Sequence, residues 1–486
     1  MAKMIGIVLS LVVLVALAYR GVTVLILAPL AALLAVLLQA DAPVLASYTQ
    51  VFMPAAGTFI ALYFPLFLLG ALFGRLMEDA GAAQVIAQRF ASGLGPRHTV
   101  LALVLACAVL TYGGVSLFVV AFAIYPIASA MFEQADIPKR LMPATIALGA
   151  FTFTMTALPG TPAIQNAIPM PFFNTTPFAA PGLGAIGAAI MLAVGLAWLS
   201  WRVRKARLAA EGYLDFKAAA PRPLKALREH AQGEGFDLME IGPATQPDAA
   251  GPTPSLINAL APIGLVIVLN YIFSNLVFAR IDTGYLALPQ YGQTTIASVK
   301  GMWAIICALL LVNLYLVATS ARLRARLKSS LSDGANAAVL PIFNTASLVG
   351  FGAVIASLAS FASIRDAILS VAPSNPLVSL SISVNVLAGI TGSASGGMSI
   401  ALQTLGERYL ELAAAAGIAP ELLHRVTTIA TGGLDALPHN GAVITLLSIC
   451  KLTHRDAYLD IFVVAVAGPI AALVAVVALG SWLGVF

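Results

Sequence analysis

Long apolar stretches recur from one end of the 486-residue chain to the other. Most of them exceed the roughly 20 residues that a helix needs to cross the hydrocarbon core of a bilayer. Charged residues make up only 10% of the chain, whereas a typical soluble domain has about 25%. The residue alternation of outer-membrane barrel strands does not occur in the sequence. We therefore expect an all-α polytopic membrane protein with the lipid bilayer as its surroundings.

The basic residues lie beside the apolar stretches, which indicates membrane topology and not nucleic-acid binding. Two basic clusters, at 202–207 and 322–328, are placed in the cytoplasm by the positive-inside rule. The apolar spans at 256–278 and 300–320 would then cross outward and back. The polar segment 201–255 is predicted to be a cytoplasmic linker. This topology puts the N-terminus outside. The expected location is the inner (cytoplasmic) membrane of a bacterium.

Two further regions have the composition of re-entrant hairpins. Region 99–132 begins and ends beside residues that favour the cytoplasm, and it is too short for two full crossings. Region 367–406 carries no charge and would enter from the outside. Their centres, at 111–116 and 391–397, are rich in Gly, Ser and Thr and are the predicted hairpin tips.

The two halves of the chain share several landmarks at one spacing. The glycine pairs of the two predicted tips, and the Ala-Leu-Pro tripeptides at 157–159 and 436–438, are each separated by about 280 residues. The charges orient the two halves in opposite directions. We therefore predict two inverted-topology repeats. The predicted parts are a first membrane half, 1–200 (repeat about 20–200), and a second half, 256–486 (repeat about 300–486).

Each half also contains a helix interrupted by proline, at 140–170 and at 421–450. A backbone group without a partner inside a membrane costs several kcal/mol, so breaks persist where protein or a wet cavity satisfies them. Single Gly or Pro breaks are often ordinary kinks, but four breaks at matched positions are typical of a secondary-transporter site. Thr161 is the predicted N-cap of a half-helix that starts with Pro162.

The predicted core contains neither Arg nor Lys, so helix N-termini and polar side chains would hold an anionic substrate. Three cysteines (Cys107, Cys307 and Cys450) have no metal-type spacing, and no metal or cofactor is expected. The predicted substrate-binding residues are Thr111, Gly113, Gly114, Ser116, Thr156, Gly160, Thr161, Asn166, Ser393, Ser395, Gly396, Gly397 and Asn440.

Asp435 and His439 are the ionisable residues of the second break. Ionisable groups at membrane depth are usually functional, and either residue is a candidate carrier of a coupling proton. The plainer interpretation is that Asp435 caps the half-helix begun by Pro438 and that His439 lies at a wet helix end.

Three segments resemble the gluconate:proton symporter family: TYGGVSLFVVAFAIYPI (111–127), FTMTALPGTPAIQNAIP (153–169) and GGLDALPHNGAVITLL (432–447). They are most similar to its divergent branch of permeases labelled as carrying β-hydroxybutyrate or related acids. The family belongs to the ion-transporter superfamily. The resemblance implies a homodimer with a scaffold domain and a mobile transport domain, working by an elevator mechanism. Gluconate carriers have a Pro-Pro-His-Pro-Gly turn where this chain has Leu158–Pro162, which favours a smaller, less hydroxylated acid.

The leading hypothesis is a proton-coupled symporter of a short hydroxy- or keto-carboxylate, such as β-hydroxybutyrate or gluconate. The alternative is sodium-coupled transport of a di- or tricarboxylate such as citrate, with Ser393, Ser395, Asn440 and hairpin-tip carbonyls as sodium ligands. A channel is a third option. A membrane-embedded enzyme is not expected, since the sequence shows no nucleophile–base pair or metal motif.

Overall fold

The computed structural model describes residues 2–18, 22–39, 43–213, 253–372, 375–438 and 440–486. These residues form helices and connecting turns and contain no β-strand. The helices of the first half are α1 (Ala2–Ala18), α2 (Val24–Leu37), α3 (Val44–Ala46), α4 (Met53–Asp79), α5 (Ala82–Leu94), α6 (Thr99–Tyr112), α7 (Leu117–Gln134), α8 (Met142–Ala150), α9 (Phe153–Thr156), α10 (Ile164–Ala167), α11 (Pro169–Phe173) and α12 (Pro181–Leu208). Those of the second half are α14 (Leu256–Ile272), α15 (Ile296–Thr319), α16 (Ala321–Ser357), α17 (Phe361–Ser370), α18 (Pro376–Thr391), α19 (Ala394–Ala415), α20 (Pro420–Leu434), α21 (Gly441–Ile449), α22 (His454–Phe462) and α23 (Gly468–Leu483).

The expected class, an all-α multi-pass membrane protein, is confirmed. Within the described residues, seven helical segments are long and apolar enough to cross a membrane. They are Val44–Asp79, Leu117–Gln134, Pro181–Leu208, Leu256–Val277, Ile296–Thr319, Ala321–Ser357 and His454–Leu483. Two of these segments join two α-helices through a π-helical turn, at Ser47–Phe52 and Val463–Ala467.

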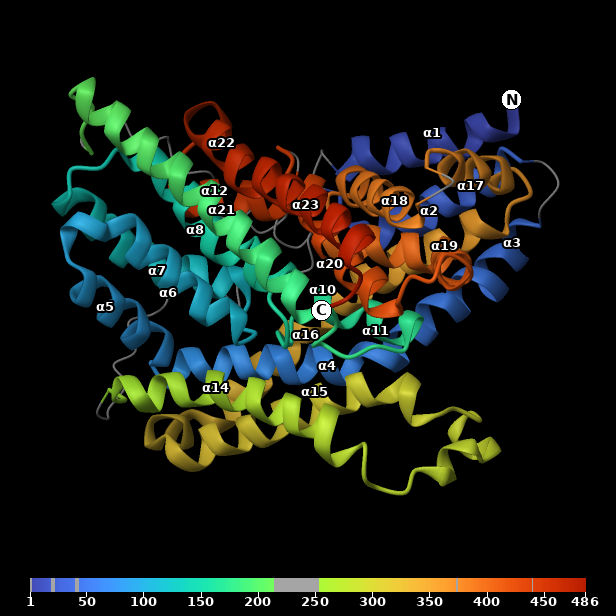
Figure 1. Cartoon of the computed structure of the whole chain (residues 1–486), viewed down its shortest axis with the longest axis horizontal. Coiled ribbons are helices and arrows are strands. Elements are labelled where there is room, and N and C mark those ends of the chain that lie inside the picture. Colours follow the sequence, from blue (N-terminus) through green and yellow to red (C-terminus); the bar gives the residue numbers. More distant parts are fainter. Residues whose placement is uncertain (1, 19–21, 40–42, 214–252, 373–374, 439) are drawn as a thin grey trace.

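Helices α4 and α16 lie side by side and make the most extensive helix–helix contact of the fold. Gly334 on α16 permits this approach, because a Cβ there would lie 2.9 Å from Leu72 Cδ2 on α4. Helix α15 packs against α4, and α14 packs against α15 and α5; both lie below α4 in the view of Figure 1, and the hairpins lie above it. Helix α14 also reaches the first hairpin and the first break, because Ile263 lies against Gly113 and Asn270 bonds to Gly160.

Both predicted re-entrant regions form pairs of helices that fold back on themselves, α6–α7 and α18–α19 (Figure 1). The two hairpins lie at opposite ends of the molecule. The first turns at Gly114, whose φ of +99° favours glycine, and the second turns at Gly392, whose φ is +64°. The second hairpin starts at Pro376 and ends at Ala415. The region 361–370 before it is the separate helix α17.

Both proline-interrupted regions are broken helices. Residues 142–173 form four short helices, and residues 420–449 form α20 and α21. The predicted cap at Thr161 is wrong, because the chain turns through Pro162 and Ala163 before α10 begins at Ile164. Asn440 is the N-cap of α21, and its side chain accepts the Val443 N–H, so neither Asp435 nor Pro438 starts that helix. The opposite orientation of the two repeats stays a prediction.

Side chains from neighbouring helices hydrogen-bond the backbone carbonyls that these breaks leave without helical partners. At the first break, Tyr112 Oη donates to Pro159 O at 2.7 Å and Asn270 Nδ2 donates to Gly160 O at 3.2 Å. At the second break the corresponding bonds are His454 Nε2 to Pro438 O at 2.7 Å and Tyr458 Oη to Ala436 O at 3.2 Å.

A buried carboxylate joins the end of α12 to α22. Asp460 is 1% exposed and accepts hydrogen bonds from Arg202 Nε at 2.7 Å and Trp198 Nε1 at 2.9 Å. Arg140 Nη1 lies 3.3 Å from Asp460 and its fork also binds Glu211 at 2.6 and 2.7 Å. The hydrogen bond to Glu211, supported by Asp460, raises the pKa of Arg140, so this guanidinium stays charged. Most of the predicted linker, residues 214–252, lies outside the described residues.

Candidate functional site

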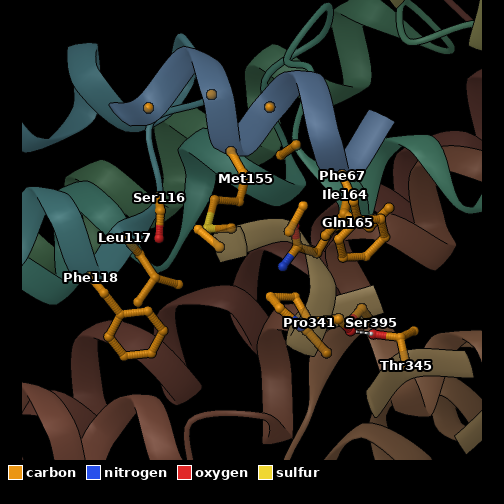
Figure 2. A pocket seen from close by; sticks show the side chains of 18 of the residues that line it. Phe67, Ser116, Leu117, Phe118, Met155, Ile164, Gln165, Pro341, Thr345 and Ser395 are labelled. Atoms are coloured by element: carbon orange, nitrogen blue, oxygen red, sulfur yellow. Dashed lines mark hydrogen bonds between the residues drawn. The ribbon is translucent and has the colours of Figure 1, made fainter. Parts of the chain in front are cut away.

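A cavity of about 280 Å³ lies where the two hairpin tips and the two broken helices meet α4 and α16. Figure 2 shows its wall, with Ser116 and Leu117 from the first hairpin, Gln165 from the first break, and Pro341 from α16. The four broken elements predicted from the sequence therefore share one cavity.

Apolar side chains make much of the cavity wall, among them Phe67, Leu117, Phe118, Met155, Ile164, Pro341 and Leu348. Polar groups enter between them from both halves of the chain. They are Thr111, Ser116, Gln165, Asn344, Thr345, Thr391, Ser393, Ser395, Asp435 and Asn440. An apolar surface with a few convergent polar groups is the usual composition of a small-molecule site.

Ser116, at the start of α7, contributes a hydroxyl with no partner in the described structure. Ser116 is the N-cap residue of α7, yet its side chain makes no capping bond, and its buried Oγ has no hydrogen-bond partner. Val120 N–H is the first to bond within the helix, to Ser116 O at 3.0 Å. The preceding N–H groups of a helix have no intrahelical acceptor and bear partial positive charge. This helix start is suited to binding an anion.

The equivalent position of the second hairpin differs. Ser393 is the N-cap of α19, and its Oγ accepts the Gly396 N–H at 3.2 Å. Asn440 Nδ2 donates to Gly392 O at 2.7 Å and so ties the second tip to the second break. The two hairpin tips therefore differ. The Ser393 hydroxyl is engaged in a capping bond, whereas the Ser116 hydroxyl has no partner among the described residues.

Gln165 adds a second polar group to the wall made by the first break. Its side chain is 9% exposed and lines the cavity. Oε1 is buried and makes no hydrogen bond in the part of the chain that the structure describes. A buried acceptor without a partner is unfavourable, which makes Gln165 a natural contact for a ligand or a water.

Asp435 is the acidic residue of the second break and lines the cavity. It is the C-cap residue of α20. The last carbonyls of a helix carry partial negative charge, so the helix dipole disfavours a negative charge at this place. His439, the other residue predicted to carry a proton, lies outside the described residues.

The structure divides the predicted site residues into two groups. Those that line the cavity are Thr111, Gly114, Ser116, Ser393, Ser395, Asp435 and Asn440. Those that lie behind its wall are Gly113, Thr156, Gly160, Thr161, Asn166, Gly396 and Gly397. Gly113, for example, packs against Ile263 of α14, where a Cβ would lie 2.8 Å from Ile263 Cγ1. Their roles as ligands of a substrate stay predictions.

The expectation that the core lacks Arg and Lys is wrong. Arg425 lies on α20 with no exposed surface and is the largest fully buried side chain of the described residues. His424 beside it is also fully buried, with Nδ1 2.6 Å from Thr175 Oγ1 and Nε2 3.1 Å from Asn166 Oδ1. A neutral imidazole fits these contacts by accepting from Thr175 and donating to Asn166. The sequence signal for His424 and Arg425 was the presence of a cationic residue within the predicted broken span 421–450.

Charged residues from α4 and α16 line one end of the cavity. They are Arg75, Glu78 and Asp333. Arg75 Nε lies 2.9 Å from Asp79 Oδ2 and its Nη2 lies 3.2 Å from Asp333 Oδ2, so this arginine joins the two helices. Ser330 Oγ donates to the same Asp79 oxygen at 2.6 Å. This end of the cavity belongs to the face that the basic clusters predict to be cytoplasmic.

Comparison with known proteins supports a transport role for a chain of this fold. No family model matches the sequence. A protein of Bacillus subtilis named "Uncharacterized transporter YxjC" is 44% identical over 488 residues, and the alignment covers 99% of each chain. A match of this extent includes both hairpins, both broken helices and the cavity between them.

Proposed function

Because the chain belongs to the family of the Bacillus subtilis transporter YxjC and is a multi-pass membrane protein, we propose that it carries a small organic anion together with a proton. The substrate class is a short hydroxy- or keto-carboxylate, and the site of action is the cytoplasmic membrane of a bacterium. The resemblance to the gluconate:proton symporter family, and within it to β-hydroxybutyrate carriers, is part of this proposal.

One observation carries the proposal: both hairpin tips and both broken helices face a single cavity. The α7 N-terminus with Ser116 Oγ offers donors to a carboxylate, and Gln165 and the Ser and Thr hydroxyls would bind the hydroxyl or keto group. A membrane enzyme that uses a metal would need a cluster of ligands at this place, and the described residues contain no group of three or more His, Cys, Asp or Glu that could hold a metal ion.

The size and surface of the cavity favour a small substrate. Its volume of about 280 Å³ is just below the roughly 300–1,000 Å³ that is usual for small-molecule sites. Phe67, Met155 and Ile164 present apolar surface to it, which suits an acid with a short aliphatic chain better than a fully hydroxylated sugar acid.

Asp435 is the proposed proton carrier. Its position at the C-terminal end of α20, facing the cavity, makes the helix dipole act against the ionised form of this side chain. An anionic substrate in the same cavity would disfavour it further by repulsion. Proton binding at Asp435 and substrate binding would therefore assist each other, which is the thermodynamic requirement for symport.

The proposed mechanism is alternating access of the elevator type, in a homodimer. In this scheme α4, α14, α15 and α16 belong to the scaffold, and the hairpins and broken helices belong to the moving unit. Arg75, Glu78 and Asp333 at one end of the cavity would mark its cytoplasmic opening, so the conformation described here would face inward.

A ligand screen tests the substrate class. A panel of mono-, di- and tricarboxylates with 3-hydroxybutyrate, gluconate and citrate among them would be added to the purified protein while its thermal unfolding is followed. A ligand that binds the folded state raises the apparent stability, by about 2.7 kcal/mol at a hundredfold excess over Kd. We expect stabilisation by short hydroxy-monocarboxylates. Stabilisation by citrate alone, with a requirement for sodium, would favour the sodium-coupled alternative.

The variant Asp435→Asn tests the proton carrier. We expect the Asp435→Asn variant to bind substrate and to exchange it across the membrane. A pH gradient should no longer drive accumulation of substrate in proteoliposomes. Asp366→Asn is a matched control, because that carboxylate is 67% exposed and pairs with Arg365 at the surface. Accumulation by Asp435→Asn at the wild-type level under the same gradient would remove Asp435 from the coupling mechanism.

A further inference from the structure

We propose that Arg425 is a positioning residue of the transport site, and that its buried charge makes the cavity selective for anions. This inference rests on the proposed function, since selectivity for anions matters only if the cavity binds an anionic substrate. The conformation of the first break and the sign of the electrostatic potential in the cavity can both be measured without a substrate.

The guanidinium of Arg425 holds the segment that follows the first break. Nε and Nη2 donate to Ala179 O at 3.0 and 2.7 Å. Nη1 donates to Thr156 O at 3.3 Å and to Asn166 Oδ1 at 3.4 Å, and Nη2 lies 3.5 Å from Pro177 O. Residues from before and after the break, from Thr156 to Ala179, thus converge on one side chain of the other half of the chain.

Neighbouring residues complete this arrangement. Asn166 Nδ2 donates to Thr161 O and Pro177 O, both at 3.0 Å, and its Oδ1 faces His424 and Arg425. Gly184 on α12 leaves room for the guanidinium, because a Cβ there would lie 3.1 Å from Arg425 Nε. The fork of arginine donors matches several carbonyls at once, which the single ammonium of lysine does not.

Arg425 is a cation without a counter-ion among the described residues. Each of its acceptors is a carbonyl or amide oxygen, and no ion pair joins it to an Asp or Glu there. Carbonyl dipoles stabilise the charge but do not neutralise it. A buried net charge in a medium of low polarisability acts over a longer distance than one in water.

This charge lies directly behind the cavity wall. Two of its acceptors, Thr156 and Asn166, are the sequence neighbours of Met155 and Gln165, which line the cavity. Among the described residues, the side chains that face the cavity include the acids Glu78, Asp333 and Asp435 but only one Arg or Lys, Arg75, which is paired with Asp79 and Asp333. The positive potential that an anion requires would come from Arg425 and the α7 N-terminus.

Charged thiol reagents measure this potential at a cysteine in the wall. Gln165→Cys would be made in a protein whose three native cysteines are replaced by alanine, and the detergent-solubilised protein would react with an anionic (sulfonatoethyl) or a cationic (trimethylammonium-ethyl) methanethiosulfonate. Removing a unit charge roughly 10 Å away, at an effective dielectric constant of about 20, changes the local concentration of a monovalent reagent roughly tenfold. The rate at which the cysteine reacts with the anionic reagent, divided by its rate with the cationic reagent, should therefore fall at least about tenfold in Arg425→Gln.

Two comparison variants separate charge from general damage. Arg425→Lys keeps the charge, so its ratio should stay within about twofold of the Arg425 protein. Arg408→Gln removes an arginine that is 53% exposed and pairs with Glu411, so it should leave the ratio unchanged. An unchanged ratio in Arg425→Gln, or an equal fall in Arg425→Lys, would overturn the electrostatic role.

Amide hydrogen exchange over residues 157–163 tests the positioning role. Both Arg425 variants lose the fork, so exchange there should become faster in both while exchange in α16 stays the same. Equal exchange in all three proteins would overturn this role.

If Arg425→Gln does not fold, the Arg425 protein still gives a test. The ratio of the reaction rate with the anionic reagent to that with the cationic reagent should be larger at Gln165→Cys than at Thr345→Cys on the opposite wall. Equal ratios at the two positions would contradict the inference. A protein that transports no carboxylate but shows these ratio changes would refute the proposed function alone.

Discussion

The buried carboxylate of Asp460 offers a prediction whose magnitude follows from its contacts. Its two oxygens accept hydrogen bonds from Trp198 and Arg202 and contact Arg140, and the side chain is 1% exposed. In Asp460→Asn the amide removes the negative charge, and its NH₂ group must face a guanidinium. Breaking one partner out of a buried ion pair typically destabilises a protein by about 3–5 kcal/mol. Arg140 keeps its bond to Glu211, so we expect the lower part of this range.

Equilibrium unfolding in mixed detergent micelles would measure this loss. Asp366→Asn makes the same chemical change at an exposed pair, where Arg365 and Asp366 are 44% and 67% exposed, and should change the free energy of unfolding by less than about 1 kcal/mol. If Asp460→Asn unfolded within about 1 kcal/mol of the unmodified protein, the assignment of Asp460 as a structural centre joining α12 to α22 would be refuted.

Two further predictions concern the hairpins. Gly397→Ala puts a Cβ against the backbone of Ala388 in the opposite arm, so it should destabilise the protein by about 1–3 kcal/mol and reduce transport. Gly264→Ala is the control, because nothing lies within 4 Å of the new Cβ. In the same unfolding and uptake assays it should be neutral or slightly stabilising. Tyr112→Phe leaves the Pro159 carbonyl without its donor and should lower the free energy of unfolding by about 1–3 kcal/mol; a stability equal to the parent protein would show that water replaces this bond.

The sequence was sufficient to locate the elements of the cavity. Gly and Pro act through the local backbone, so the hairpin turn at Gly114 and the break after Thr156 were visible without knowledge of the fold. The low density of charge likewise predicted a multi-pass helical membrane protein.

The sequence did not reveal which side chains face the cavity. Asn166 and Gln165 are adjacent in the same short helix, yet Gln165 lines the cavity and Asn166 points to the other half of the chain. That direction is decided by packing against α20, whose Arg425 lies 259 residues away along the chain.

Arg425 shows the same limitation. Its partners are carbonyls of residues 156–179, which no charge pattern or periodicity can indicate. The exact helix ends were also beyond prediction. The long helix α16 starts at Ala321 and includes the basic cluster, and α12 continues through its own basic cluster to Leu208, because long helices extend beyond the apolar core of a bilayer.

Uptake into proteoliposomes tests the central claim most directly. Purified protein would be reconstituted and supplied with radiolabelled 3-hydroxybutyrate, or with the carboxylate that stabilises it best, under an imposed pH gradient, an imposed sodium gradient, or neither. The account predicts saturable uptake that the pH gradient drives above equilibrium, with counterflow when the lumen holds unlabelled substrate. Uptake driven by sodium alone, or rapid flux that neither saturates nor shows counterflow, would contradict it.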